Sequence, residues 1–301
     1  MNKKDLVSVI IPSYKNVDLL DRAIKSVLNQ TYKDIEIIIV DDNIPESSYR
    51  YETEKLMHQY LKYSRIKYIK NEKKSERSYS RNSGVLHSEG EYIAFLDNDD
   101  EYLPEKIENQ VKRLKEMGSK YVVCYSAYIR KIEEKTICSC GEFREGDLKT
   151  EILARDFPIH PGSNLLIRKE AFENCGGFSE SMSWNEDIDL LIKLIEFGHI
   201  ACDKKVGLIV HIHREGKKVD LESITRAYYE REKKYIDSLD GKKGDLVRQV
   251  LGLQLIKYYI RYPRKIIRIM KEWHVSIILM FRYFIYLGIR ILNGQAYGFI
   301  K

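Results

Sequence analysis

Gly90-Glu-Tyr-Ile-Ala-Phe-Leu-Asp-Asn-Asp-Asp100 is the stretch that decides the fold, because an apolar run stops there at a cluster of carboxylates. The run Tyr92–Leu96 has the pattern of a strand buried on both faces, as in a parallel sheet. In open sheets of this kind, ligands bind beyond the carboxyl ends of the strands. Asp97 and Asp99 form an Asp-x-Asp pair there, and two carboxylates can hold a divalent cation through oxygen ligands. Aspartate is also common in ordinary turns, so the position after a buried strand is what favours a metal site.

Strand and helix signals alternate along the first part of the chain. Apolar runs predict three earlier strands, over Leu6–Pro12, Ile35–Val40 and Ile66–Ile69. Helical spacing predicts helices between them, including one over Asp18–Gln30 with Asp18 as its N-cap. Such alternation is typical of βαβ units, and hence of a parallel sheet with helices on both faces. We therefore expect an α/β fold.

Two charged motifs lie close to the predicted edge of this sheet. Asp41-Asp42 ends the second strand, where a carboxylate can accept a hydrogen bond from a nucleotide base or a ribose hydroxyl. The alternative is a turn or helix cap. Arg81-Asn82-Ser-Gly84 lies on a predicted helix over Arg77–His87, and the guanidinium offers a two-pronged donor to phosphate or carboxylate. The alternatives for Arg81 are a solvated helix face and an internal salt bridge.

The pattern is less regular later in the chain. Gly141–Ile159 is expected to form a loop, and a helix is expected from about Asp187 to Phe197. Glu186-Asp187 opens that helix, where the carboxylates either cap the first turn or supply a general base. In His211-Ile-His213 the two imidazoles can share one face of a strand. His213 is a candidate for a third metal or phosphate contact, and the alternative is a structural histidine.

Charge is distributed unevenly over the 301 residues, whose net charge is 51 − 45 = +6. Residues 216–301 hold 18 Lys/Arg against 8 Asp/Glu, or +10, and residues 1–215 hold 33 against 37, or −4. A basic segment of this kind suggests contact with a membrane or a nucleic acid. The five cysteines are irregularly spaced and read as reduced thiols. No apolar run is long enough to span a bilayer and no secretory signal opens the chain, so we expect a cytoplasmic protein.

The basic segment is expected to consist of three or four helices. Pro263–Leu292 combines apolar side chains, Trp273 and several cations, a composition that suits a helix lying in a lipid headgroup interface. The alternative is packing on the catalytic domain or on a second copy of the chain, and the two can coexist. We do not expect nucleic acid as a partner. The working hypothesis is a peripheral protein on the inner face of the cell membrane.

Taken in order, these motifs resemble glycosyltransferase family 2, whose catalytic domain has the GT-A fold. The resemblance covers about residues 5–215 and rests on segments that are individually weak but jointly specific: Val7-Ser-Val-Ile-Ile-Pro-Ser-Tyr14, Ser26-Val-Leu-Asn-Gln-Thr-Tyr32, Ile38-Ile-Val-Asp-Asp42, Arg81-Asn-Ser-Gly84, the stretch 90–100, Gly176-Gly-Phe178 and Glu186-Asp187. It implies a Rossmann-like, mostly parallel sheet in a catalytic domain over 1–215. Nucleotide-sugar binding would occupy about 1–130, acceptor binding and catalysis about 131–215, and a helical extension 216–301.

The resemblance also implies a role for individual residues. Tyr14 would stack on the base, and one of Asp41 and Asp42 would read the base edge. Asp187 matches the catalytic base. The nucleotide-sugar site as a whole would comprise Pro12, Ser13, Tyr14, Asp41, Asp42, Arg81, Asp97, Asn98 and Asp99, with Asp97 and Asp99 holding Mn²⁺ or Mg²⁺ and Arg81 contacting the base or the diphosphate. No motif marks the acceptor side, which we expect to include Trp184, Glu186, the segment Phe143–Ser163 and the tail.

Three departures from the family pattern bear on function. Asn43-Ile44 replaces the usual Gly-Ser after the first aspartate pair, and Ser80 replaces the usual alanine before Arg81. The chain also lacks the Gln-x-x-Arg-Trp motif of processive polymerases, so we expect one sugar to be transferred per acceptor visit. The resemblance implies an inverting transfer from a nucleotide sugar, with UDP favoured, to a glycan or lipid-linked acceptor in bacterial cell-surface polysaccharide synthesis.

Two other classes of function compete with this one. A dinucleotide-dependent oxidoreductase needs a Gly-x-Gly-x-x-Gly turn after the first strand, and this chain has Pro12-Ser-Tyr-Lys-Asn16 there. A GT-A-fold module that has lost catalysis and serves as a scaffold remains open, although Asp97, Asp99 and Asp187 speak against it.

Overall fold

The computed structural model of the protein describes residues 3–182, 184–212 and 220–292, and it divides into two compact units. The first unit comprises Met1–Asp147 and Ile159–Ile212, and the second comprises Leu148–Pro158 and His213–Lys301. The division predicted near residue 215 differs from this arrangement at one point, because Leu148–Pro158 groups with the C-terminal helices.

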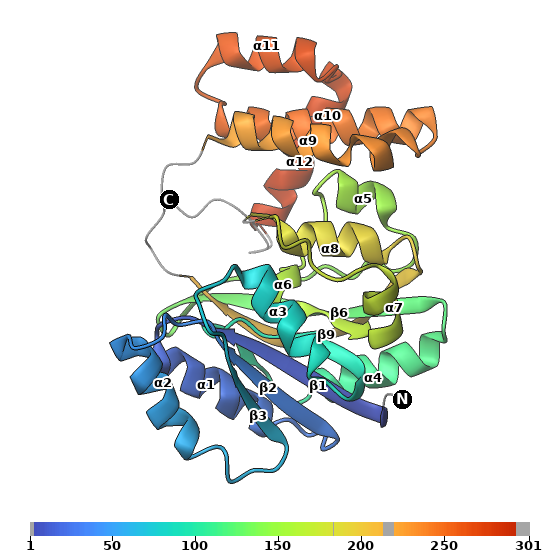
Figure 1. The fold of residues 1–301 in the computed structure, drawn as a ribbon. Helices are drawn as coiled ribbons and strands as arrows, with labels where there is room; N and C mark the ends of the chain where they lie inside the picture. The colour runs from blue at the N-terminus through green and yellow to red at the C-terminus, as the bar shows by residue number, and fades with distance from the viewer. Residues whose placement is uncertain (1–2, 183, 213–219, 293–301) are drawn as a thin grey trace. The chain divides into compact units, whose positions relative to one another are not determined.

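The first unit is built on a nine-stranded sheet with the order β3-β2-β1-β4-β8-β6-β9-β5, in which β7 pairs with β6 (Figure 1). Strands β1 to β4 are parallel, as expected, and so are β6 and β9. The other half of the sheet is mixed, because β8 runs antiparallel to both β4 and β6, and β5 runs antiparallel to β9. The bounds are β1 (Lys3–Ser13), β2 (Ile35–Asp41), β3 (Ile66–Lys70), β4 (Gly90–Phe95), β5 (Glu101–Tyr102), β6 (Tyr121–Ile132), β7 (Lys135–Cys140), β8 (Leu166–Arg168) and β9 (His199–His211).

Helices cover both faces of the parallel half of the sheet, and β1 is accordingly apolar on both sides. Val7, Val9 and Ile11 share a core with apolar residues of α1, α2 and α4. On the opposite face, Ile10 meets α3 so closely that a Cβ added at Gly84 would lie 2.4 Å from Ile10 Cγ2. The helices of this unit are α1 (Val17–Leu28), α2 (Ser48–His58), α3 (Arg77–Leu86), α4 (Lys106–Met117), α6 (Pro161–Asn164), α7 (Lys169–Asn174) and α8 (Glu186–Leu194). The expected α/β architecture with helices on both faces is confirmed.

Several local predictions were wrong. Asp18 lies in the first turn of α1, and Asn16 occupies the N-cap position in a left-handed backbone conformation. The long strand β9 was missed because charged residues interrupt its apolar pattern at an irregularity, where Lys204 has φ of 60°. The segment Gly141–Ile159, predicted to be a loop, contains the short helix α5 (Lys149–Leu153).

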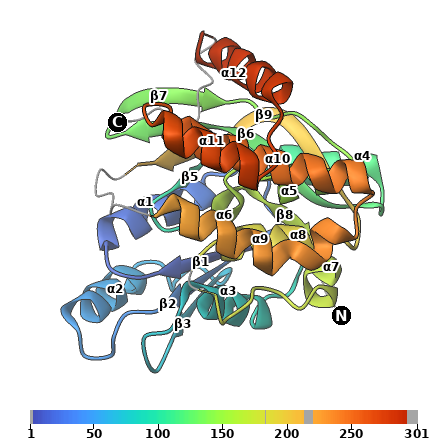
Figure 2. The same cartoon turned by 90° about the horizontal axis from the view of Figure 1, so that it is seen from above.

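The second unit is helical, as predicted for the C-terminal segment. It contains α5, α9 (Leu221–Asp237), α10 (Gly241–Tyr258), α11 (Pro263–Glu272) and α12 (Ile277–Leu292). Asp220 and Asp240 cap α9 and α10 by accepting backbone hydrogen bonds in the first turn. Figures 1 and 2 both show α9 running alongside α10. Gly252 lets α10 approach the end of α11, because a Cβ there would lie 2.5 Å from Trp273 Cβ.

The last described helix differs from the others, because α12 has no buried residue. Its exposed apolar side chains are Ile277, Ile278, Phe281, Ile285, Ile289, Ile291 and Leu292. Among the described residues, no single helix is long and apolar enough to cross a membrane. The pair α11 and α12, bent by 117° at the break between them, reaches that length and composition only when taken together.

Candidate active site

Three parallel strands of the first unit end at one edge of the sheet. β1 lies between β2 and β4, with Ser13 opposite Asp41 in the register. The residues that follow the three strands therefore meet at this edge, and they include Tyr14, Asp42 and Asp97. This is the edge at which the sequence predicted ligand binding.

Both carboxylate oxygens of Asp41 are bonded to other residues of the protein. Its Oδ2 accepts a hydrogen bond of 2.5 Å from Tyr68 Oη and lies 3.2 Å from Arg50 Nε, and its Oδ1 accepts bonds from the backbone and side chain of Asn43. Burial raises the pKa of Asp41 above its ordinary value, although these donors oppose the shift. The side chain is 0% exposed, so Asp41 holds the loop after β2 in place.

Asp42 and Ser13 lie at the same edge in a different setting. Asp42 Oδ1 accepts hydrogen bonds from Asn71 Nδ2 (2.7 Å) and from the backbone N–H of Ser75 (2.9 Å), and the residue keeps 6% of its surface exposed. Ser13 is buried, and its Oγ has no hydrogen-bond partner among the described residues. A buried hydroxyl without a partner is costly, which makes this position a candidate ligand contact.

An aromatic side chain with two lysines beside it follows β1. Tyr14 is 38% exposed, and the ammonium groups of Lys15 and Lys74 lie 5.1 and 5.4 Å from the centre of its ring. Pro12 precedes it, half-buried in β1. An exposed ring near cations can stack on a base while the cations meet negative charge.

Arg81 lies between the acidic residues of the site. Its Nη2 donates to Asp97 Oδ1 at 2.6 Å, and its Nη1 donates to Glu186 Oε1 at 3.0 Å. Burial alone would raise the pKa of Asp97, but the guanidinium groups of Arg81 and Arg77 outweigh burial and hold that pKa below its ordinary value. Arg81 thus occupies the internal salt bridge that the sequence left as an alternative.

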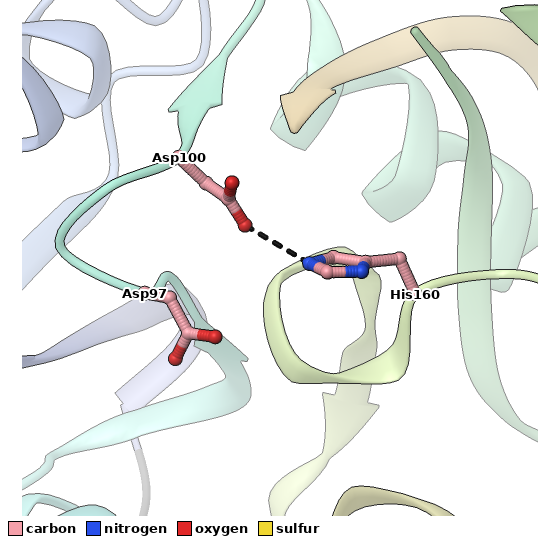
Figure 3. A group of neighbouring side chains, drawn as sticks. All are labelled: Asp97, Asp100 and His160. Atoms are coloured by element: carbon pink, nitrogen blue, oxygen red, sulfur yellow. Dashed lines mark hydrogen bonds and ion pairs between the residues drawn. The ribbon is translucent and has the colours of Figure 1, made fainter. Parts of the chain in front are cut away.

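Asp97, Asp100 and His160 form a group that could hold a metal ion, with one ligand atom from each lying within 4.8 Å of the others. Figure 3 shows His160 turned toward the carboxylate of Asp100, with 3.1 Å between His160 Nε2 and Asp100 Oδ2. Carboxylate oxygens suit Mg²⁺ and Mn²⁺, and an imidazole nitrogen favours the softer of these, Mn²⁺. The donor set therefore fits a divalent cation.

The other residues predicted for this site are placed as follows. Asp99 lies in the same turn, and its backbone oxygen accepts a 2.7 Å hydrogen bond from Arg22. Asn98 Nδ2 donates to the backbone oxygen of Lys15 at 3.5 Å. His211 Nε2 lies 2.6 Å from Glu101 Oε1, and His213 falls outside the described residues.

Asp187 opens α8 next to Glu186. Its Oδ1 accepts a 2.9 Å hydrogen bond from the backbone N–H of Ile188 in the first turn of the helix, whose N-cap position is occupied by Asn185. Burial, together with the neighbouring carboxylate of Glu186, raises the pKa of Asp187 above its ordinary value, which suits a general base. Trp184, predicted on the acceptor side, is 58% exposed, whereas Glu186 is buried against Arg81.

Three residues of this cluster received no role from the sequence. Asp100 ends the quoted acidic stretch, and that position is the signal that could have identified it. His160 lies in the segment Phe143–Ser163, which was expected on the acceptor side with no role for this residue, and it is 60 residues from Asp100 along the chain. Asn82 Oδ1 accepts from the backbone N–H of Phe178, and Asn82 Nδ2 donates to Phe178 O and to Glu180 Oε1. Contacts across such separations leave no local pattern.

Comparison with known proteins identifies the family. Residues 8–176, more than half of the chain, match the model of glycosyl transferase family 2. The chain belongs to this family. It is 35% identical over 216 residues to an uncharacterized glycosyltransferase of Rickettsia prowazekii, covering 69% of this chain and 64% of the relative. It is also 41% identical over 198 residues to an uncharacterized glycosyltransferase of Methanocaldococcus jannaschii, covering 64% of this chain and 65% of the relative.

Two further similarities concern proteins with more specific names. A putative teichuronic acid biosynthesis glycosyltransferase of Bacillus subtilis, TuaG, is 37% identical over 116 residues, covering 38% of this chain and 44% of TuaG. The crystal structure of S. aureus TarS 1-349 in complex with UDP-GlcNAc superposes with a TM-score of 0.64 at 18% identity, covering 84% of this chain and 72% of that one.

These similarities confirm the expected family and the GT-A fold. The chain spans between 30% and 65% of the length of the glycosyltransferases of Rickettsia and Methanocaldococcus that it matches. The substrates and partners of this chain are therefore taken up as proposals.

Proposed function

We propose that this family 2 member is an inverting, metal-dependent glycosyltransferase that moves one sugar from a UDP-sugar to a hydroxyl of a glycan or lipid-linked acceptor in bacterial cell-surface polysaccharide synthesis. The observation that carries the proposal is the grouping of Asp97, Asp100 and His160 at the sheet edge. Arg81 connects this group to the start of α8 by its hydrogen bonds to Asp97 and Glu186. The similarity to TuaG, a putative teichuronic acid biosynthesis glycosyltransferase, and to TarS, solved with UDP and with UDP-GlcNAc, supports this donor and pathway class.

The donor side of the proposal rests on the residues after β1 and β2. Tyr14 would stack on the uracil, and Asp42 would accept a hydrogen bond from it, because Asp41 has no exposed surface. The hydroxyl of Ser13 would gain the partner that it lacks. Lys15 and Lys74, whose ammonium groups lie beside Tyr14, would meet the negative charge of the nucleotide.

The metal would be held by Asp97, Asp100 and His160, with Asp99 in the same turn as a further carboxylate. When bound, a divalent cation neutralises the charge that develops on the departing diphosphate. This set differs from the predicted Asp97, Asp99 and His213, of which His213 lies outside the described residues.

Asp187 would act as the general base. Its carboxylate takes the proton of the acceptor hydroxyl as that oxygen bonds to the anomeric carbon, and the bond from that carbon to the diphosphate breaks on the opposite face. The electron pair leaves with the nucleoside diphosphate, and a single displacement inverts the anomeric configuration. General-base assistance of this kind contributes about 10²–10⁴-fold in rate.

We also propose that the second unit holds the enzyme on the inner, cytoplasmic face of a membrane. In α12 the residues Ile277, Ile278, Phe281, Ile285, Ile289 and Leu292 recur at helical spacing on one exposed face. We call these six residues the apolar ridge. The preceding helix α11 carries Arg264, Lys265, Arg268 and Lys271, and such a pairing of apolar surface with cations suits anionic lipid. A second copy of the chain is the alternative occupant of the ridge.

The donor proposal is tested by thermal shift with UDP-, GDP-, dTDP- and CDP-sugars, each with and without Mn²⁺. A ligand that binds only the folded protein at about 100 times its Kd adds about 2.7 kcal/mol of stability. We expect a shift with a UDP-sugar that Mn²⁺ enlarges, lost in Tyr14→Ala and kept in the control Tyr51→Ala, since Tyr51 is an exposed tyrosine of α2. No shift with any donor would favour the scaffold alternative, and a shift with another nucleotide would overturn the choice of UDP.

A further inference from the structure

Arg81 joins two parts of the site that are far apart in the sequence. One prong of its guanidinium is bonded to Asp97, in the turn after β4, and the other to Glu186, 105 residues away along the chain at the start of α8. Glu186 is the immediate neighbour of Asp187. A single side chain, that of Arg81, therefore connects Asp97 to the residue next to the proposed base.

The surroundings of Arg81 leave it no route to a nucleotide. The residue is 1% exposed, and both of its terminal nitrogens already bond to carboxylates. The ring of Phe178 lies 5.1 Å from Cζ, and Nε is buried without a hydrogen-bond partner among the described residues. On another side, a Cβ added at Gly162 would lie 3.4 Å from Nη2 and 3.2 Å from Asp97 Oδ2.

The next residue of α3 makes a second connection to the same region. Asn82 holds the backbone of Phe178 by donating to its carbonyl and accepting from its N–H, at 2.9 and 3.0 Å. Gly177, with φ of 65°, turns the chain there, and a Cβ on it would lie 2.9 Å from Asn82 Oδ1. Consecutive residues of α3 thus fix both ends of the segment from Phe178 to Glu186.

We propose that Arg81 is a positioning residue that fixes Glu186 and Asp187 relative to Asp97, and that it does not contact the nucleotide. This replaces the role that the family resemblance implied for it, and it rests on the proposed function of Asp97 and Asp187. A planar guanidinium can bond two carboxylates at once in fixed geometry, which the single ammonium of a lysine cannot reproduce.

The first test separates positioning from nucleotide contact. UDP binding is measured by calorimetry in EDTA, so that no metal links Arg81 to the nucleotide through Asp97. For Arg81→Lys we expect the Kd to stay within about threefold of the wild type, because no contact is lost. A direct contact to phosphate or base would instead weaken binding about tenfold or more, and that result would overturn the proposal.

The second test asks whether Arg81 acts through Glu186. Displacing a reacting group by about 1 Å can cost about 100-fold in rate, so Arg81→Lys and the isosteric Glu186→Gln should each lower Mn²⁺-dependent UDP-GlcNAc cleavage by that order. The double variant Arg81→Lys/Glu186→Gln should be no slower than the worse single variant, because both break the same connection. If the fold-loss in cleavage rate of the double variant equals the product of the two single losses, a shared role is contradicted.

A third readout does not depend on activity. Hydrogen exchange of the segment from Phe178 to Leu194 should quicken in Arg81→Lys and in Glu186→Gln, because the start of α8 loses its connection to α3. The matched control is Arg113→Lys. Arg113 lies away from the site and donates to both carboxylate oxygens of Glu145, at 2.8 and 2.9 Å. Unchanged exchange in this segment overturns the positioning role. Absence of cleavage in the wild type would instead count against the proposed function.

Discussion

The two units of the chain use charge in opposite ways. In the first unit two arginines of the site are buried and paired, with Arg50 against Asp41 and Arg81 against Asp97 and Glu186. In the second unit, α11 exposes its cations to solvent, and α12 exposes its apolar side chains as well.

This difference separates the buried charges, which fix the geometry of the protein, from the exposed charges, which can bind another molecule or surface. A buried ion pair leaves a costly unpaired charge when one partner is removed, so it fixes geometry. Exposed cations contribute little to stability and are screened by salt, but they attract an anionic surface. Substitutions in the first unit should therefore change chemistry or folding, and those in α12 should change attachment alone.

The largest effect is expected at the proposed base. Asp187→Asn should lower sugar transfer by about 10²–10⁴-fold while the Kd for UDP stays near the wild-type value. Asp189→Asn is the matched control, because Asp189 lies in the same turn but bonds to Ser179 Oγ at 2.7 Å. Transfer by Asp187→Asn at a near wild-type rate would remove Asp187 as the base.

The next effect concerns the apolar ridge. Burying a phenylalanine is worth about 1.5–3 kcal/mol, so Phe281→Glu should weaken binding to anionic vesicles by about 10- to 100-fold. Phe197→Glu, at an exposed phenylalanine of the first unit, should leave vesicle binding unchanged.

The same variants distinguish the alternative occupant of the ridge. Sedimentation of the wild type and of Phe281→Glu without vesicles reports the oligomeric state. If the wild type is a dimer that Phe281→Glu dissociates, while vesicle binding is the same in both proteins, the ridge joins two copies and the membrane proposal is wrong.

A smaller effect tests Lys106, a buried cation that donates hydrogen bonds to two neutral oxygens. Lys106 donates to Gln110 Oε1 and to Asn164 O at 2.8 and 2.9 Å, and burial lowers its pKa to about 7. Because the unfolded lysine keeps its proton up to about pH 10, the unfolded state binds more protons between these values. The free energy of unfolding should therefore rise by up to about 1.4 kcal/mol per pH unit above pH 7.

Lys106→Met should remove this contribution, whereas Lys112→Met, on the exposed side of the same helix, should retain it. Urea unfolding at pH 7 and pH 9 measures the difference between the variants. A slope with pH that is equal in Lys106→Met and in the wild type would show that Lys106 titrates normally.

The smallest effect is expected at Gly162. A methyl group there would lie 3.2 Å from Asp97 Oδ2, so the carboxylate has to move by a few tenths of an ångström. Gly162→Ala should lower Mn²⁺-dependent cleavage by about threefold without changing metal-free UDP binding, because no charge is removed. A loss as large as that of Arg81→Lys would mean that packing, rather than the guanidinium, sets the geometry.

The sequence predicted the parallel half of the fold well, because buried strands such as those that precede Asp42 and Asp97 are continuous apolar runs. It predicted that Asp42 and Asp97 lie at one edge of the sheet, because each follows such a strand. It missed β9, whose apolar pattern is interrupted by charge, and it missed His160, which only the folded chain brings to Asp100. The pairing of Arg81 with Glu186 was an open alternative, since no local pattern reports a contact over 105 residues.

The central claim is that the cluster around Asp97, Arg81 and Asp187 carries out sugar transfer by a single displacement. The most direct measurement follows the sugar released from the α-linked donor that gives the largest Mn²⁺-dependent thermal shift, by ¹H NMR before mutarotation. The account predicts that the β anomer appears first, and only in the presence of the metal. First appearance of the α anomer would contradict a single displacement, and metal-independent release would contradict the role given to Asp97, Asp100 and His160.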